Sequence, residues 1–501
     1  MKKTASTESA TFHTPCTKAQ RLPRRRILAG AMAAFLGLAG GAQAVVQDWD
    51  VNGATAGFGG TGDWNLTTPN WNDATGTGVP SLWLNKADTD AVFQGTPGVV
   101  TLTVAGVQAR NLTFNVGGYT VAGSVAAPLN LTSNAVVTVT NAADTATISA
   151  PLVTTTGFDK QGPGTLVLSG ANTYSGQTSV SAGTLKAGSV TAFSATSNYF
   201  VSGTLDLGGF SNPVGGLAGL ASAFVTNNGP AAAVLTLGAN NLDATFQGVI
   251  QDGPGGVSAL GITKTGTAAQ TFTGANTYTG DTLLQSGSLF ADVSPGGATN
   301  KAFGTGVLVT SDATRIGSTV DNEVIANNIK LQGDLTIEAH SHLKLPGTVD
   351  MDGGVRGLNG STTNAEINFT GEIKNGGLTF NSPVNYTSYI IGKGDGTDVA
   401  NTYTGLTTVN NNSYLVLNKD LPGAAIDGAI LGDVVQNGTG SLDYFKPDQI
   451  SDTSSVTVNG PGNFLGADNY AGMQLNNHDE TIGSLFGAST EKIARPVDGH
   501  R

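Results

Sequence analysis

Few side chains in this sequence combine the residue types and the spacing that metal binding would need. His340 and His342 are two residues apart in IEAHSHLKL, so both would lie on one face of a strand, as a pair of metal ligands requires. Two ligands alone do not make a metal site. An exposed polar strand face explains the pair better, and we expect no metal here.

Acidic residues near the N-terminus match part of a calcium-binding loop. DWDVNG places Asp48, Asp50 and Asn52 at positions 1, 3 and 5 of such a loop. The twelfth position is Gly59, where a bidentate Glu is required. This segment therefore fails the test for a calcium site, whereas the acidic turns DGPGG at 252 and GKGDGTD at 392 are best interpreted as solvated turns, and we predict no metal ion and no cofactor.

The sequence also lacks a recognisable catalytic arrangement. No serine stands in a G-x-S-x-G motif, and the one cysteine, Cys16, lies in a segment expected to be removed. Acids on alternating strand positions are scattered, as in Asp350 and Asp352, whereas a polysaccharide hydrolase needs two opposed carboxylates. We predict that the protein is not an enzyme, and a polysaccharide lyase or hydrolase stays open as the alternative.

The N-terminus has the layout of a signal peptide. Three arginines at 24–26 precede an apolar run from Ile27 to Leu38, and a small-residue A-Q-A sequence ends at Ala44, the expected cleavage position. Because R-R-x-I-L also fits a twin-arginine signal, the general secretory and twin-arginine routes both stay open. Cleavage would leave 17 basic and 35 acidic residues, a net charge near −18, so we expect no nucleic-acid partner.

The composition indicates ordered β-structure. Gly makes up 71 of the 501 residues, only 12% are charged, and short runs such as TLVL alternate with Gly, Asn and Asp turns. No sustained helical periodicity occurs, so helices should be nearly absent. All four tryptophans fall between 49 and 83, where we expect bulky side chains to cap the first coil rather than to stack sugars.

One motif returns three times, as GANTYSG at 170–176, GANTYTG at 274–280 and VANTYTG at 399–405. The copies are 104 and 125 residues apart, much more than one solenoid coil, so they cannot form one stacked ladder. We predict that each copy closes a corner, its Asn bonding local backbone and its Tyr covering an exposed end of the core. A repeated sugar site built on Asn and Tyr is the alternative.

The first unit, KQGPGTLVLSGANTYSGQTSVSAGTLKAG, shows why these residues favour short strands. Its alternation places Leu166 and Leu168 on one face of a strand, and Gly or Asn stands at each turn. The second unit keeps every offset, whereas the third is shorter between its lysine and its Asn. The positions assigned a structural role in the motif are Lys160, Gly164, Leu166, Asn172, Tyr174, Gly176, Lys264, Asn276, Tyr278, Gly280, Lys393, Asn401, Tyr403 and Gly405.

These residues resemble the autotransporter-associated β-strand repeat, also called the passenger-associated transport repeat, with the pattern K-x-G-x-G-T-L-x-L-x-G-x-N-T-Y-x-G-x-T-x-V-x-x-G-T-L. Elements of the F-x-G-x-I type, at 246–250 and 369–373, also resemble this family. The resemblance implies an all-β, right-handed parallel β-helix, here with an atypical N-terminal capping segment. It also implies a passenger that a C-terminal translocator barrel displays at the outer membrane.

The C-terminal part departs from that pattern. We expect no transmembrane barrel in this chain, because nothing after residue 410 offers an array of alternating segments of about ten residues. Leu217 is followed 29 residues later by Phe246, whereas Leu485 has only 16 residues after it, so the last cycle is not completed. A truncated or frameshifted coding sequence is the favoured interpretation, and a short capping tail is the other.

These observations divide the chain into a signal peptide (1–44), a cap with the first coils (45–150), a solenoid with the repeats (151–487) and a basic tail (488–501). We predict an exported, non-enzymatic adhesin or structural scaffold at the cell surface or outside the cell, or in the periplasm if the translocator is absent. Host or matrix glycans or proteins are the expected partners. A truncated remnant without independent function is a further alternative.

Overall fold

The structure is a computed structural model, and its described part runs from residue 44 to 487. Within that range it leaves out 54, 56, 133, 257, 294–301, 385, 423–427, 461–471 and 477, and beyond it describes only the backbone of 493–494. The predicted signal peptide, except Ala44, and the other residues of the basic tail lie outside the described residues. The described residues all belong to one compact unit.

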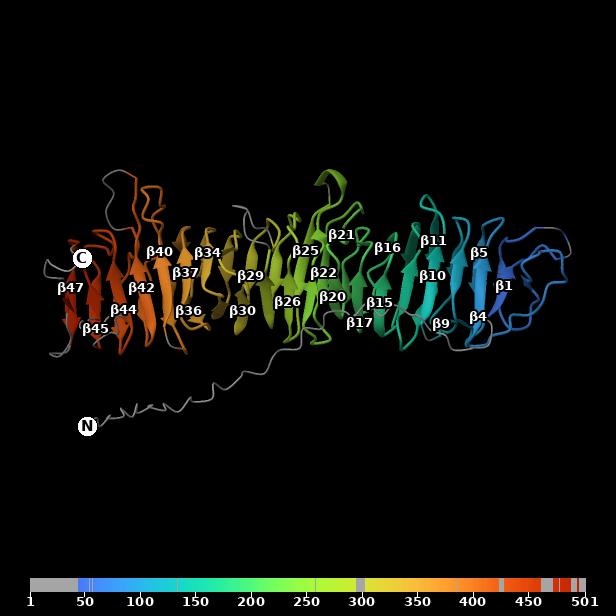
Figure 1. Cartoon of the computed structure of the whole chain (residues 1–501), viewed down its shortest axis with the longest axis horizontal. Helices are drawn as coiled ribbons and strands as arrows, with labels where there is room; N and C mark the ends of the chain where they lie inside the picture. Colours follow the sequence, from blue (N-terminus) through green and yellow to red (C-terminus); the bar gives the residue numbers. More distant parts are fainter. Residues whose placement is uncertain are drawn as a thin grey trace, which may run out of the picture. The chain divides into compact units, whose positions relative to one another are not determined.

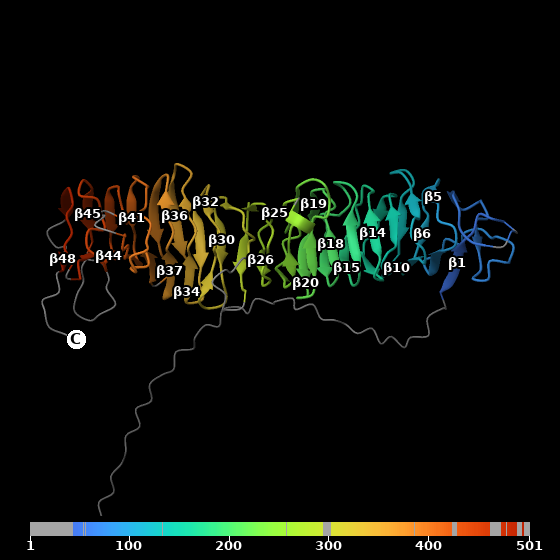
Figure 2. The same ribbon diagram turned by 90° about the horizontal axis from the view of Figure 1, so that it is seen from above.

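The strands of the described residues are short and, apart from β3, parallel, and one 3₁₀ turn, η1 (Pro254–Gly256), occurs among them. Most strands pair in register with a strand one coil later, as Thr178 of one coil does with Tyr199 of the next. Figures 1 and 2 show these coils following one another in chain order from β1 to β47. The expected parallel β-helix, a β-solenoid without α-helices, is confirmed over the described residues.

The first face of the coils is a continuous ladder of nineteen parallel strands. At about 4.8 Å between strands, this ladder extends for about 90 Å. Its strands are β1 (Val45–Trp49), β4 (Thr89–Phe93), β7 (Leu112–Phe114), β10 (Ala135–Val139), β13 (Phe158–Gln161), β15 (Gly176–Val180), β17 (Ser197–Val201), β20 (Gly216–Gly219), β23 (Ala244–Phe246), β26 (Ala269–Phe272), β28 (Ser288–Ala291), β30 (Thr314–Gly317), β33 (Leu335–Glu338), β36 (Val355–Gly360), β39 (Gly377–Asn381), β41 (Thr407–Val409), β43 (Val434–Asn437), β45 (Ser455–Asn459) and β47 (Ser484–Gly487).

The second face follows the first along the chain and consists of two sheets with a break between β24 and β31. The first sheet contains β2 (Gly62–Trp64), β5 (Val99–Leu102), β8 (Thr120–Ala122), β11 (Thr145–Ile148), β14 (Thr165–Leu168), β16 (Thr184–Ala187), β18 (Thr204–Asp206), β21 (Phe224–Thr226) and β24 (Val249–Ile250). The second contains β31 (Glu323–Val324), β34 (His342–Leu345), β37 (Ala365–Phe369), β40 (Thr387–Ile391), β42 (Ser413–Leu417), β44 (Ser441–Tyr444), β46 (Met473–Gln474) and β48 (Ile493–Ala494).

The third face closes each coil before the chain returns to the first face, and it is also interrupted. Its early sheet contains only β6 (Gln108–Ala109), β9 (Leu129–Leu131) and β12 (Leu152–Val153). Its later sheet contains β19 (Asn212–Val214), β22 (Ala233–Leu237), β25 (Leu260–Lys264), β27 (Thr282–Leu284), β29 (Leu308–Thr310), β32 (Ile329–Leu331), β35 (Val349–Asp350) and β38 (Ile373–Lys374).

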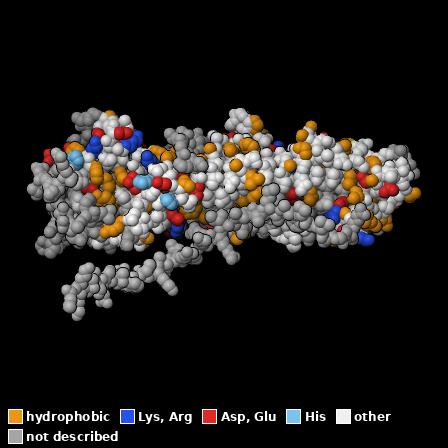
Figure 3. Space-filling view, viewed as in Figure 1, with side chains coloured by type: hydrophobic (Ala, Val, Ile, Leu, Met, Phe, Trp, Pro, Cys, Tyr) orange, Lys and Arg blue, Asp and Glu red, His pale blue; other side chains and the backbone are white. Residues whose placement is uncertain are grey.

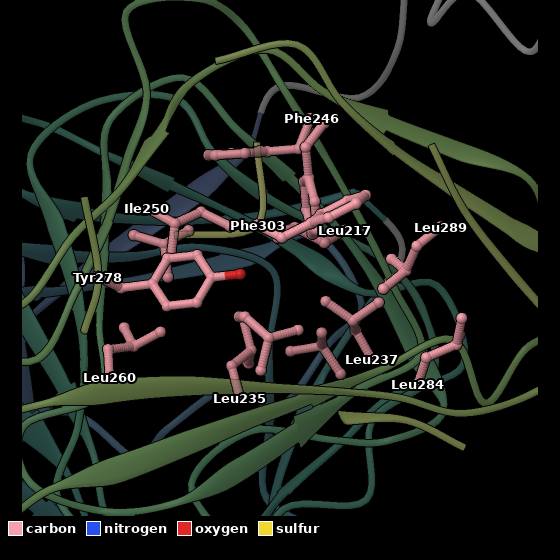
Figure 4. Packing of buried hydrophobic residues seen from close by; sticks show 14 of the residues in the cluster. Leu217, Leu235, Leu237, Phe246, Ile250, Leu260, Tyr278, Leu284, Leu289 and Phe303 are labelled. Atoms are coloured by element: carbon pink, nitrogen blue, oxygen red, sulfur yellow. The ribbon is translucent and has the colours of Figure 1, made fainter. Parts of the chain in front are cut away.

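The core lies inside the coils and is continuous from the first coil to the last described ones. In β14 the side chains of Leu166 and Leu168 point inward and are fully buried, whereas Thr165 and Val167 between them are partly exposed, as the alternation predicts. Leu and Ile side chains from successive coils therefore stack in rows, and Figure 4 shows this packing around Leu235, Leu237 and Phe246.

The tryptophans form the predicted cap. β3 (Trp71–Asn72) pairs antiparallel with β1, so it covers an edge of the first parallel strand. Ring centroids of neighbouring tryptophans lie 4.4 to 5.2 Å apart, and all four rings are buried. Buried rings offer no face for stacking a sugar, and Asp48 and Trp49, which pair with β3, present no free edge to another chain.

None of the described residues belongs to a helix long and apolar enough to cross a membrane.

Candidate functional site

The asparagine of the repeated motif links three successive coils. Asn172 is buried, accepts a hydrogen bond from the backbone N–H of Leu152 (2.7 Å) and donates one to the carbonyl of Ala192 (2.7 Å). These partners belong to the preceding and following coils. The expectation that the amide bonds local backbone is therefore wrong, because the motif replaces a strand and the amide continues the ladder across the gap.

The other two copies repeat this arrangement. Asn276 accepts from the N–H of Ile250 at 2.7 Å and donates to the carbonyl of Ala302 at 2.5 Å. Asn401 accepts from the N–H of Ile373 at 2.9 Å and donates through Nδ2 to the next coil at 2.7 Å. An Asn at this position satisfies one orphaned donor and one orphaned acceptor of the backbone at once.

The tyrosine of the motif lies inside the coil. Tyr174, Tyr278 and Tyr403 are fully buried, and burial raises the pKa of each phenol above its usual value. Figure 4 shows the Tyr278 ring among the buried Leu and Ile side chains, and its hydroxyl lies 2.6 Å from Oγ1 of Thr282. The expectation that the Tyr covers an exposed end of the core is wrong, because the motif occurs in mid-solenoid, where coils lie on both sides.

The three copies do not share one face. Copies one and three follow strands of the second face and occupy the third face, after β14 and β40. Copy two follows β26 of the first face and occupies the second face. The copies therefore form no common row, as their spacing predicts, and a single ligand site cannot contain all three.

The lysines of the first two copies are buried under the turns. Nζ of Lys160 donates to the carbonyls of Gln161, Gly162 and Ala182, the last from the following coil, at 2.8 to 3.1 Å. Lys264 makes the equivalent contacts, and burial lowers the pKa of both ammonium groups to about 8. These lysines serve as donors to corner carbonyls and present no cation to solvent.

Lys393 does not occupy the equivalent position in copy three. In copy one Lys160 pairs with Val180, eight residues after the motif Asn, and the corresponding pair in copy three joins Phe380 to Val409. Phe380 therefore stands where the lysine stands elsewhere. Its ring packs 4.9 Å from that of Tyr389, and Lys393 instead begins an extra loop in which its Nζ lies 3.3 Å from Oγ1 of Thr397.

The last glycine of the motif permits a close approach of coils. A Cβ atom added at Gly176, Gly280 or Gly405 would lie within 2.5 Å of backbone atoms of the preceding coil. Gly164 is similarly enclosed, with the carbonyl of Asn141 at 2.5 Å from such a Cβ. These positions therefore admit no larger residue without displacing the backbone.

The residues with potential for chemistry lie apart. Nδ1 of His342 is 3.0 Å from Oδ1 of Asp321, and its Nε2 is 3.9 Å from Oε2 of Glu366, all on the solvent side of the second face. Figure 3 shows histidines at the surface with acidic side chains beside them. Among the described residues, no group of three or more His, Cys, Asp or Glu side chains could hold a metal ion.

The DWDVNG segment, which matches part of a calcium-binding loop, belongs to the N-terminal cap. Oδ1 of Asp50 accepts from the N–H of Asn52, and Oδ2 accepts from Nδ2 of Asn72 at 2.9 Å. Oδ1 of Asp48 accepts from Gln94 at 2.6 Å, and burial raises the pKa of Asp48. These contacts hold the first strand against the cap.

The scattered acids at 350–352 are also engaged separately. Both carboxylate oxygens of Asp350 lie 3.1 Å from Nδ2 of Asn375. Asp352 forms an ion pair with Lys330 at 3.0 Å. They therefore do not make the opposed pair that glycoside hydrolysis uses.

An asparagine ladder on the first face is a feature that the sequence analysis missed. Nδ2 of each Asn donates to Oδ1 of the Asn one coil earlier, at 2.8 to 3.1 Å. The spacing between successive members varies between 22 and 29 residues, so the sequence shows no regular period. The available sequence signal is that four of the five members have a Thr or Val two positions before them. The members are Asn359, Asn381, Asn410, Asn437 and Asn459.

The fold and the repeated geometry of the motif define a class, the parallel β-solenoids with passenger-type repeats. A family model described as passenger-associated-transport-repeat matches residues 158–187 and 262–289, which are copies one and two. The chain therefore carries two passenger-associated transport repeats and resembles an autotransporter passenger. No solved structure matches the chain significantly.

A curated relative extends the similarity over most of the chain. The Adhesin BmaC autotransporter of Brucella suis biovar 1 (strain 1330) is 31% identical over 454 residues, which is 84% of this chain. The aligned part is 12% of that protein, so the chain spans about an eighth of its relative's length. The similarity therefore reaches well beyond the two matched repeats.

Proposed function

We propose that this protein is an exported, adhesin-like passenger that uses its coil surface to contact glycans or proteins of a host or matrix, without catalysing a reaction. The observation that carries the proposal is the 31% identity to an adhesin over 84% of the chain. The predicted signal peptide supports export to the cell surface or beyond.

The surface chemistry supports adhesion. Thr is the most frequent residue at the outward positions of the strands, where Val, Asn and Ser also occur, and Figure 3 shows a surface on which charged groups are sparse. Rigid coils order these hydroxyls and amides before a partner arrives, which reduces the entropy lost on binding. A large surface of weak, preordered contacts suits attachment.

The proposal has two parts, adhesion and the absence of catalysis, and one experiment tests both. The purified full chain would be coated on beads and tested on cultured cell layers and on surfaces carrying matrix proteins or polysaccharides. We expect retention of coated beads above that of beads coated with an unrelated solenoid, and no shortening of the polysaccharides. Equal retention would refute the adhesive role, and loss of polymer length would favour the lyase or hydrolase.

A further inference from the structure

A shallow hollow of about 610 Å³ lies on the third face, beside the first copy of the motif. Its walls come from four neighbouring coils, represented by Gly106, Asn130, Val153 and Thr173. Val153 pairs with Asn130 in the strand ladder, and the N–H of Thr173 bonds to the preceding coil. Because successive coils are about 4.8 Å apart, the hollow runs along the coils for about 14 Å.

The lining of this hollow is uncharged and rich in hydroxyl groups. No Asp, Glu, Lys, Arg or His contributes to it, although the chain carries 36 acidic and 24 basic residues. Apolar atoms come from Pro128, Leu131 and Val153. The hydroxyl-bearing residues are Thr132, Thr154, Thr155, Thr156, Thr173 and Ser175.

The motif itself supplies two of these hydroxyls. Along N-T-Y-S the side chains of Asn172 and Tyr174 point inward, whereas Thr173 is exposed and Ser175 is half-buried on the outside. The described structure gives the hydroxyls of Thr155, Thr173 and Ser175 no hydrogen-bond partner. They are therefore available to a ligand without breaking a contact in the coil.

The other two copies show a different use of the same outward positions. Thr279, which corresponds to Ser175, donates to Oδ2 of Asp252 in the preceding coil at 2.7 Å. Thr402, which corresponds to Thr173, donates to Oε1 of Glu372 at 2.7 Å. Copy one has Thr154 where copy two has Asp252, so only copy one leaves both outward hydroxyls unoccupied among the described residues.

We propose that this hollow binds a neutral oligosaccharide, which deepens the proposed function and rests on it. Hydroxyls that donate and accept match the hydroxyls of a sugar, and the apolar atoms of Leu131 and Val153 suit the C–H faces of its ring. An anionic glycan would find no cation here. An extended peptide would find no free strand edge, because the strands at this position pair with coils on both sides.

The test uses the purified full chain on an array of neutral oligosaccharides built from glucose, galactose, mannose and N-acetylglucosamine, printed beside sialylated and uronate-containing glycans. We expect binding to one or more neutral glycans and none to the anionic set. The double variant T173A/S175A should weaken that binding about tenfold, because it removes two direct hydrogen bonds. The matched control T277A/T279A changes the same motif positions in copy two and should leave binding unchanged.

Three results would overturn the proposal. They are absence of neutral glycan binding, equal binding of anionic glycans, and unchanged affinity of T173A/S175A in titrations with the best neutral glycan. Thermal unfolding of both double variants would show whether they fold as the parent does. We expect that they do, because the exchanged side chains lie outside the core. If any of these three results occurs while beads coated with the parent chain still attach, the hollow is refuted while the adhesive role stands. If the parent chain attaches to nothing, the adhesive role itself fails.

Discussion

Replacing Asn276 by Ala tests whether the motif asparagine holds the coils together. The change removes hydrogen bonds at 2.7 and 2.5 Å and leaves the N–H of Ile250 and the carbonyl of Ala302 without partners inside the solenoid. An unsatisfied buried backbone group costs about 1 to 3 kcal/mol. Both groups together should lower the free energy of unfolding by about 2 to 6 kcal/mol.

The loss should be local, because each coil contacts only its neighbours. Amide hydrogen exchange would show faster exchange at Ile250 and in the adjoining coils, with little change beyond residue 340, and urea unfolding would give the magnitude. The control is Thr277→Ala, whose exposed side chain makes no contact that matters to the ladder. A cost below about 1 kcal/mol for Asn276→Ala, or equal effects of the two variants, would refute the bridging role.

Three further predictions concern the motif tyrosine, the motif lysines and the asparagine ladder. Tyr278→Phe should cost about 1 kcal/mol at pH 7 by removing the hydroxyl contact to Thr282. Burial raises the pKa of this phenol in the folded state above its usual value of about 10. The stabilisation that the neutral phenol provides is therefore present below about pH 10 and is lost as the pH rises beyond it. Because the variant lacks this ionising group, its free energy of unfolding, measured by urea titration, should fall less steeply above about pH 10 than that of the parent. Lys264→Met should lower the free energy of unfolding by about 3 kcal/mol, since it leaves turn carbonyls unpaired, while Lys393→Met should change the urea midpoint little. A larger effect of Lys393→Met than of Lys264→Met would contradict the finding that Phe380, and not Lys393, occupies the position of the motif lysine in copy three. Asn410→Ala interrupts the asparagine ladder and should cost about 1 kcal/mol, visible as faster hydrogen exchange in the neighbouring coils, and unchanged exchange would show that the ladder adds no stability.

Much of the fold could be predicted because it depends on local patterns. Alternation in TLVL places Leu166 and Leu168 inside, and the tryptophan cluster marks the cap. Both depend on residue type and short spacing, which the sequence shows directly. The Asn, Tyr and Lys residues that sequence reasoning selected in copies one and two make equivalent contacts, although the two copies lie on different faces of the solenoid.

The direction of the motif side chains and the third copy could not be derived in the same way. Whether the Tyr closes an end or fills the interior depends on the coils above and below it, which lie 20 or more residues away. In copy three Lys393 lies in an extra loop after Ile391, so it precedes the motif closely in the sequence. The position in the coil that Lys160 and Lys264 occupy in the other copies is taken by Phe380. The asparagine ladder was missed because loops of unequal length separate its members.

The placement of the motif on two different faces bears on how such chains change length during evolution. The motif brings its own means of closing a coil, namely an amide bridge, an inward phenol and a close-packed glycine, and none of these depends on which face carries it. A duplicated or deleted gene segment therefore does not have to preserve the face on which the motif lands. Natural selection can lengthen or shorten the protein by whole coils, while each junction keeps the same local chemistry.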